Sequence, residues 1–168
     1  MKGRERKVGE KVMILTYNGL KKLEDELDYL KTEKRKEIAE TIKVARGFGD
    51  LSENAEYDEA KKEQAEVEVR IVKLEKMLQN TELLNDSDIS TEVVSIGSKV
   101  TVYDELFDEE EEFTILSPIE ADPKKNIISD ESSMGKALIG AKVGEKVKVN
   151  APNGEFEMKV LKICKYND

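Results

Sequence analysis

The sequence contains no histidine and no tryptophan, and its 168 residues include a single cysteine, Cys164. Without histidine, Ser-His-Asp triads, histidine–metal sites and imidazole acid–base catalysis are excluded. One cysteine excludes an internal disulfide and favours a reducing compartment. Any chemistry must therefore come from carboxylates, lysine, arginine, tyrosine or a metal ion held by oxygen ligands.

Long apolar stretches are also missing. No run is long and apolar enough to span a membrane, and the basic N-terminal stretch M-K-G-R-E-R-K-V-G-E-K lacks the apolar region of a secretory signal. We therefore expect a cytoplasmic protein without a membrane partner. The net charge of −9 argues against unaided binding to a nucleic-acid backbone, where lysine and arginine must neutralise phosphates.

Apolar residues at helical spacing predict a long first helix that begins after Thr16, a suitable N-cap residue. Eight residues separate Leu30 from Ile38, an interval that keeps helical phase without strict heptads. The apolar positions are Leu20, Leu23, Leu27, Leu30, Ile38, Ile42 and Ala45. Four basic residues lie between Leu30 and Ile38: Lys31, Lys34, Arg35 and Lys36. We interpret these bases as a solvated, ion-paired face, with a contact to RNA or a partner as the alternative.

The second helical pattern is more regular, because its seam residues step by three and four along the chain. They are Tyr57, Ala60, Gln64, Val67, Ile71, Leu74, Leu78 and Thr81. This spacing predicts a coiled-coil seam in which Gln64 fixes the register. A short connection makes two long helices antiparallel neighbours. With roughly thirty residues in each helix, we expect a hairpin about 45 Å long.

A polar linker, residues 85–90, precedes a change of the apolar period from helical spacing to two. Strands are predicted near residues 94–96, 100–102, 113–115, 126–129, 146–149 and 155–163, with a short helix at 132–139 that ends at Gly140. The acidic run 104–112 is predicted to be a solvated hairpin loop, since it lacks the glycine and ligand spacing of a calcium loop. The last two strands are joined by Ala-Pro-Asn-Gly, a strong turn signal.

The overall prediction is an α+β protein. We expect a flexible basic tail at 1–12, an antiparallel coiled-coil hairpin at 13–86, and a small antiparallel β domain with one short helix at 87–168. Charged residues make up 39% of the chain, which fits a long helical pair that buries only one stripe of each helix.

The turn between the predicted helices, G-F-G-D-L-S-E-N-A-E-Y from Gly47 to Tyr57, carries two carboxylates, Asp50 and Glu53. Their three-residue spacing matches a capping box, and by itself this interpretation requires no further function. However, a helix cap does not need to lie at the far end of a long helical hairpin. The position of Asp50 and Glu53 at that end favours a second interpretation, in which the two acids act on another macromolecule.

Magnesium suits that second interpretation. It usually takes one or two carboxylates and completes its octahedral shell with water and phosphate oxygens. Two carboxylates on an exposed turn would bind the ion weakly alone, but they could complete a metal site supplied by a partner. A partner that carries out two-metal phosphoryl chemistry would be the natural owner of such a site, because a second metal ion can activate a water molecule there.

The segment Gly49 to Tyr57 resembles the tip signature of bacterial Gre transcript cleavage factors. The similarity extends from residue 13 to about residue 166, and its other parts are the stretches 13–30, 126–129, 137–140 and 152–155. The resemblance implies an N-terminal antiparallel coiled coil followed by an FKBP-like domain.

The resemblance also implies a mechanism. The coiled coil would enter the secondary channel of RNA polymerase, where Asp50 and Glu53 help to hold the second Mg²⁺ ion and orient water, so that backtracked nascent RNA is cut internally. The factor would be a monomer with no nuclease activity and no stable Mg²⁺ site of its own. Tip residues that frame the motif or touch the polymerase active site would be Leu51, Ser52, Asn54 and Tyr57.

A docking role on the rim of the channel is implied for a second segment, Asp130, Glu131, Ser132 and Ser133. Ser133 stands where relatives often have proline.

Three alternatives stay open at this point. An inhibitory homologue would share the shape but carry a differently charged tip that blocks the channel. A prolyl isomerase of the FKBP type would need an aromatic-lined pocket, for which the candidates are Tyr103, Phe107, Phe113, Phe156 and Tyr166. A coiled-coil scaffold would tolerate the replacement of both tip acids by amides.

Overall fold

The computed structural model describes residues 12–47, 55–105, 107–152 and 154–167. They form the predicted α+β protein, with a helical hairpin followed by a curved β-sheet domain that contains one short α-helix. The chain divides into two compact units: the first includes Leu20–Thr81, and the second includes Met13–Gly19 and Glu82–Asp168. Among the described helices, none is long and apolar enough to cross a membrane.

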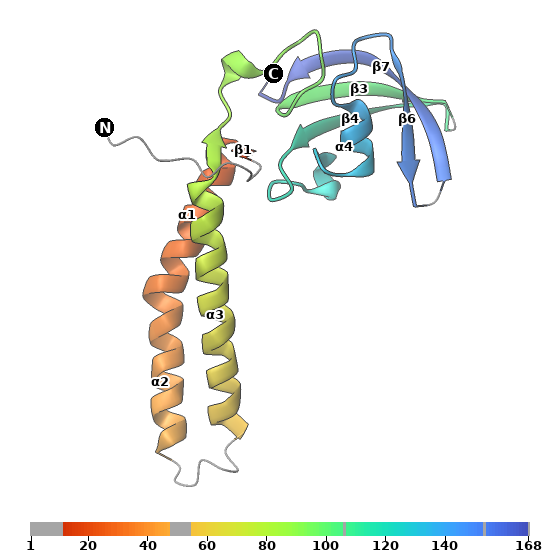
Figure 1. Cartoon of the computed structure of the whole chain (residues 1–168). Coiled ribbons are helices and arrows are strands. Elements are labelled where there is room, and N and C mark those ends of the chain that lie inside the picture. Colours follow the sequence, from red (N-terminus) through yellow and green to blue (C-terminus); the bar gives the residue numbers. More distant parts are fainter. Residues whose placement is uncertain (1–11, 48–54, 106, 153, 168) are drawn as a thin grey trace. The chain divides into compact units, whose positions relative to one another are not determined.

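The hairpin consists of one interrupted helical run and one straight helix (Figure 1). The run comprises α1 (Tyr17–Tyr29), the π-helical segment η1 (Leu30–Lys34) and α2 (Arg35–Arg46), and the partner is α3 (Ala55–Gln79). Thr16 Oγ1 accepts a hydrogen bond from Gly19 N at 3.1 Å, which confirms Thr16 as the N-cap of α1. The apolar core of the hairpin joins Ile38, Val67 and Ile71, with Leu27, Leu30 and Ile42 packed against them.

The π-helical segment η1 explains the eight-residue interval between Leu30 and Ile38. Hydrogen bonds in a π-helix close over five residues rather than four, so one extra residue fits without rotating the following helix out of phase. Leu30 therefore packs on the same core cluster that contains Ile38. The sequence pattern predicts continuous helical phase here, and the π segment is the device that provides it.

Deleting Thr32 from η1 should leave the hairpin folded, with a thermal midpoint within a few degrees of the wild type. The deletion shortens the Leu30–Ile38 interval to seven residues, which an uninterrupted α-helix accommodates. Deleting the exposed Ala39 from α2 should be clearly more destabilising, because every later residue of α2 is rotated by about 100°. Circular dichroism melts of the two proteins measure the difference, and equal destabilisation would contradict this explanation of η1.

Cross-hairpin ion pairs engage most of the basic residues near η1. Lys31 Nζ lies 2.5 Å from Glu75, and Lys34 Nζ lies 2.7 Å from Glu63. Arg35 forms a bidentate pair with Glu68 at 2.8 and 2.6 Å. Arg70 on α3 forms a bidentate pair with Glu26 on α1 at 2.6 and 2.7 Å. The ion-paired interpretation is confirmed, although the main partners lie on α3 rather than one turn away. An RNA contact would have to compete with these pairs.

Arg70→Gln should lower the stability of the hairpin at neutral pH by about 1 kcal/mol or less, since the pair is partly exposed. The hydrogen bond from Arg70 lowers the pKa of Glu26 below its ordinary value of 4.5. Because the pKa of Glu26 is lower in the folded state, its ionised form stabilises the protein at pH values above its unfolded-state pKa. This stabilisation is lost as the pH falls through the folded-state pKa of Glu26.

The difference in melting temperature between wild type and Arg70→Gln should therefore disappear at a pH well below 4.5. Lys43→Gln is the control, because Lys43 pairs with Glu40 on its own helix and does not bridge the hairpin. A difference that persisted in acid would show that Arg70 acts through packing and not through the charge of Glu26.

The base of the hairpin differs from the sequence prediction. Met13–Leu15 forms strand β1, which pairs with β2 (Thr81–Leu83) in a two-stranded sheet, and α3 ends at Gln79. Thr81 therefore belongs to a strand and not to the helical seam, and its Oγ1 donates a hydrogen bond of 2.7 Å to the Met77 carbonyl. The helical run Tyr17–Arg46 has the expected length of about 45 Å, whereas α3, with 25 residues, spans about 37 Å.

A five-stranded sheet of order β5-β4-β3-β7-β6 forms the second unit (Figure 1). Its strands are β3 (Ser98–Asp104), β4 (Glu109–Leu116), β5 (Ile127–Ser129), β6 (Lys146–Ala151) and β7 (Gly154–Lys165). One face packs on α4 (Ser133–Leu138) and contains a buried apolar cluster, which includes Val100, Val102, Ile115, Leu138 and Val160. Two short 3₁₀ segments, η3 (Asp86–Asp88) and η4 (Pro123–Lys125), lie in the connections.

Three details of this sheet correct the sequence prediction. The sheet is mixed, because β5 runs parallel to β4 after the connection that contains η4. No strand forms at 94–96 within the described chain: Val94 is buried, and its neighbour Val93 makes only an isolated bridge with Lys142. The acids Glu109–Glu112 belong to β4 and pair with β3. Ladder hydrogen bonds use the backbone, so exposed acidic side chains do not prevent strand formation.

Candidate functional site

Five of the predicted tip residues, Asp50, Leu51, Ser52, Glu53 and Asn54, lie outside the described residues. The structure describes both flanks of the tip. α2 ends at Arg46 and is capped by Gly47, whose N–H donates a hydrogen bond of 2.9 Å to the Val44 carbonyl, and α3 begins at Ala55. Gly47 has a φ of −70°, so it ends α2 without a left-handed conformation.

Small side chains bring the two helices together next to the tip. Ala45 on α2 and Ala60 on α3 are both buried, and neither carries a side chain that would hold the helices apart. Tyr57, the remaining predicted tip residue, lies half-buried in the first turn of α3. Glu56 and Asp58 share that turn, where negative charge complements the dipole of the helix. The tip thus connects two helix ends that are closely packed.

The described residues outside the tip form no further candidate metal site. Within the described residues, no group of three or more histidine, cysteine, aspartate or glutamate side chains is arranged to hold an ion. The acidic residues of the β3–β4 hairpin are instead used locally: Tyr103 Oη donates to the Asp108 carboxylate, and Lys146 pairs with Glu105 at 2.6 Å. The hydrogen bond to Asp108 raises the pKa of Tyr103 above its ordinary value.

The predicted docking segment, Asp130–Ser133, joins β5 to α4 and is held by its own hydrogen bonds. Ser132 Oγ donates to the Ser129 carbonyl at 2.6 Å and accepts from Gly135 N at 3.0 Å, so Ser132 is the N-cap of α4. Glu131 N donates to Ser129 Oγ at 3.0 Å. These bonds leave the side chains of Glu131 and Ser133 exposed at the surface, whereas Asp130 and Ser132 are half-buried.

Sequence analysis missed a polar cluster that anchors the segment before α1. The Glu120 carboxylate accepts hydrogen bonds from Thr16 N at 3.2 Å, from Thr16 Oγ1, and from Ser117 Oγ at 3.1 Å. Thr16 and Ser117 are both buried, so a charged acceptor satisfies donors that water does not reach. No local sequence pattern identifies Glu120, because its partner Thr16 is 104 residues away in the chain.

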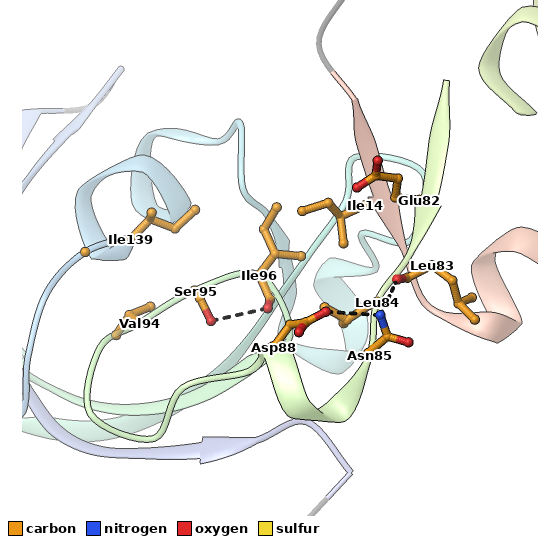
Figure 2. Close-up of a pocket in the computed structure, with 11 residues that line it drawn as sticks. Ile14, Glu82, Leu83, Leu84, Asn85, Asp88, Val94, Ser95, Ile96 and Ile139 are labelled. Carbon is orange, nitrogen blue, oxygen red and sulfur yellow. Dashed lines mark hydrogen bonds between the residues drawn. The ribbon is translucent and has the colours of Figure 1, made fainter. Parts of the chain in front are cut away.

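A pocket of about 390 Å³ also lies in the second unit (Figure 2). Its apolar wall consists of Ile14, Leu83, Leu84, Val94, Ile96 and Ile139. Its polar groups bond to near neighbours: Asn85 Nδ2 donates to the Leu83 carbonyl and to Asp88, and Ser95 Oγ donates to the Ile96 carbonyl. The described lining includes no aromatic side chain, which a prolyl isomerase pocket would require.

Sequence comparisons assign both parts of the chain. The family model "Transcription elongation factor, N-terminal" matches residues 13–83, and "Transcription elongation factor, GreA/GreB, C-term" matches residues 89–165. Transcription elongation factor GreA of Thermoanaerobacter pseudethanolicus is 59% identical over 155 residues, covering 92% of this chain and 99% of that protein. GreA of Clostridium acetobutylicum is 58% identical over 154 residues, covering 92% of this chain and 98% of that protein.

Two solved structures are also similar to this chain, at lower sequence identity. GreA factor homolog 1 (Gfh1) of Thermus thermophilus is 31% identical, with a TM-score of 0.40, over 92% of this chain and 99% of that one. The elongation factor GreA/GreB from Nitrosomonas europaea is 18% identical, with a TM-score of 0.40, over 92% and 98% of the two chains.

Proposed function

Because this chain belongs to the GreA/GreB family of transcription elongation factors, we propose that its helical hairpin carries Asp50 and Glu53 into the secondary channel of RNA polymerase. The chain is a Gre-type transcript cleavage factor that acts with RNA polymerase, a transcription factor rather than an enzyme. Its curated relatives at 59% and 58% identity are GreA proteins, and it is GreA-like.

The observation that carries the proposal is the position of the acids between two long, closely packed helices. α3 alone extends about 37 Å away from the tip, and the helices meet through the small buried residues Ala45 and Ala60 next to it. The hairpin functions as an antiparallel coiled coil, narrow enough to enter a channel. The second unit corresponds to the FKBP-like domain and remains outside.

The nuclease activity belongs to the polymerase in this proposal. Asp50 and Glu53 would supply carboxylate oxygens to a Mg²⁺ ion shared with the polymerase, and that ion would supply activation of a water molecule for hydrolysis. The RNA that is cut is the backtracked 3′ segment. Leu51, Ser52, Asn54 and Tyr57 shape the tip around the two acids. The factor acts as a cytoplasmic monomer.

Docking on the rim of the channel is assigned to Asp130–Ser133. The hydrogen bonds of Ser132 and Glu131 to Ser129 and Gly135 fix the backbone of this segment. Fixed backbone lowers the ordering cost of binding, because the exposed side chains of Glu131 and Ser133 are already presented.

A cleavage assay tests the proposal. Backtracked bacterial RNA polymerase with 5′-labelled RNA is mixed with the protein and magnesium, and the protein is also incubated with RNA alone. Shortened RNA only when the polymerase is present is the expected result. Slower nucleotide addition without shortening would indicate a channel-blocking inhibitor. No effect would indicate that Asp50 and Glu53 only cap a helix and that the protein is a coiled-coil scaffold. Titration calorimetry of the isolated protein should detect no tight Mg²⁺ site.

A further inference from the structure

A second stripe of residues at heptad spacing runs along α3, on the side away from the hairpin core. We call it the back stripe; its members step by three, four, three and four residues and are Lys62, Ala65, Val69, Val72 and Lys76. At 100° per residue, they lie opposite the buried face of the helix that contains Ala60, Val67, Ile71 and Leu74. All five members are exposed.

The two valines are unexpected on such a face. Val69 is 69% exposed and Val72 is 49% exposed, so neither contributes to the core of the hairpin. Valine is also a poorer helix former than the glutamate, lysine and glutamine that fill other exposed positions of α3, because its branched side chain loses rotamer freedom in a helix. Together the two valines present exposed apolar surface on adjacent turns of α3, the kind of surface that a partner helix covers.

The pattern of the stripe indicates what kind of surface it fits. Apolar residues at spacings of three and four are the pattern by which one helix packs along another. Lys73 and Lys76 are exposed at the C-terminal end of the apolar centre, whereas the N-terminal end is mixed, because the exposed Asp58 lies one turn before Lys62. The whole chain carries a net charge of −9, so the two lysines at the C-terminal end favour a partner that is acidic at that end. Lys62 has one weak local partner, Glu66, at 3.9 Å.

We propose that the back stripe docks against an α-helix of RNA polymerase that is apolar at its centre and acidic where it faces Lys73 and Lys76. The stripe spans about 21 Å, or four helical turns, along α3. The proposal rests on the proposed function, because a hairpin inside a channel exposes the outer face of α3 to the channel wall. It assigns to α3 a binding surface separate from the catalytic tip and from the segment Asp130–Ser133.

The test compares the affinity of fluorescently labelled variants for RNA polymerase. Val69→Gln with Val72→Gln should weaken binding about tenfold or more, since two apolar side chains no longer become buried. Lys73→Glu with Lys76→Glu should weaken it as well, and the loss should grow as the salt concentration falls. At saturating concentration the valine variant should cleave backtracked RNA at the wild-type rate, because its tip is unchanged.

A matched control is Val143→Gln in the second unit, where a valine is 53% exposed and the same change is made. It should bind as the wild type does. Wild-type affinity of the Val69→Gln/Val72→Gln protein would overturn the proposal while leaving the cleavage function intact. A failure of the wild-type protein itself to stimulate cleavage would instead overturn the proposed function.

Two further measurements separate other occupants of the stripe. Circular dichroism should show a melting temperature for the valine variant equal to or above that of the wild type, since glutamine is the better helix former. A marked loss of stability would place the stripe against another part of this chain, contrary to the proposal. Sedimentation should show the same mass for both proteins; a larger mass for the wild type alone would identify a second copy as the occupant.

Discussion

Replacing Asp50 by asparagine together with Glu53 by glutamine should reduce stimulated cleavage of backtracked RNA by at least about 100-fold. The amides keep the size of the side chains but remove two negative charges, and Mg²⁺ binds carboxylate oxygens far better than it binds amides. Under the proposed function, loss of the ion would remove several kcal/mol of stabilisation from the transition state, and each 1.36 kcal/mol corresponds to a factor of ten in rate. Binding to the polymerase should be retained, because the hairpin is unchanged.

The control for this result is Asp58→Asn with Glu59→Gln. It removes the same charge from the first turns of α3, and both residues are exposed. This control should cleave at nearly the wild-type rate. If instead the Asp50/Glu53 variant cleaved normally, the acids would be a capping box and the metal hypothesis would be wrong.

Magnesium dependence adds a readout specific to the metal. The single variant Asp50→Asn should need a higher Mg²⁺ concentration for half-maximal cleavage than the wild type, because one ligand is missing from a shared site. A simple defect in tip folding would lower the rate without moving this midpoint. Rates measured across a magnesium series distinguish the two explanations.

Gly135→Ala should destabilise the second unit by about 3 kcal/mol. A Cβ atom at this position would lie 2.1 Å from the Ser129 carbonyl oxygen and 3.0 Å from its carbon, so the first turn of α4 must move away from β5. Alanine is otherwise the better helix former by about 1 kcal/mol, and therefore a net loss would have to come from the backbone clash. Hydrogen exchange of the β3 and β7 amides measures the loss.

The matched control for Gly135 is Gly144→Ala. Gly144 has a φ of +88° but nothing within 4 Å of its would-be Cβ, so only the cost of a left-handed conformation remains, about 1 kcal/mol. Unchanged or slower exchange in the Gly135→Ala protein would show that α4 adapts without cost. Because Ser132 bonds to both Ser129 and Gly135, the same variant should also weaken polymerase binding through Asp130–Ser133.

The main elements of the fold could be predicted from the sequence because their signals are local. Leucine and isoleucine at spacings of three and four identify the faces that pack between the helices, and Thr16 marks the start of α1. The short helix at α4 follows from its serine cap and from Gly140, which has a φ of +90°. The motif around Asp50 and Glu53 is likewise a property of the sequence, and both family models match the chain without reference to coordinates.

Other features were decided by pairing between distant segments, which local patterns do not report. Met13–Leu15 lies within the predicted hairpin domain at 13–86 but before the predicted helix, and it becomes a strand because Thr81–Leu83 lies beside it. Glu109–Glu112 reads as a loop, yet the backbone of β3 provides a partner for each residue. β5 pairs in parallel with β4 because the intervening connection carries the chain back along β4 before β5 begins, an arrangement that periodicity does not encode.

The sequence by itself therefore determined the helical hairpin, its apolar faces, the acidic motif and the family. Tertiary structure alone decided how η1 absorbs an extra residue, which bases pair with α3, and how Glu120 satisfies the buried donors of Thr16 and Ser117. The physical reason is the range of the interactions. Helix periodicity and caps act within a few residues, whereas strand pairing, ion pairs and buried polar contacts depend on which distant residues the folded chain brings within bonding distance.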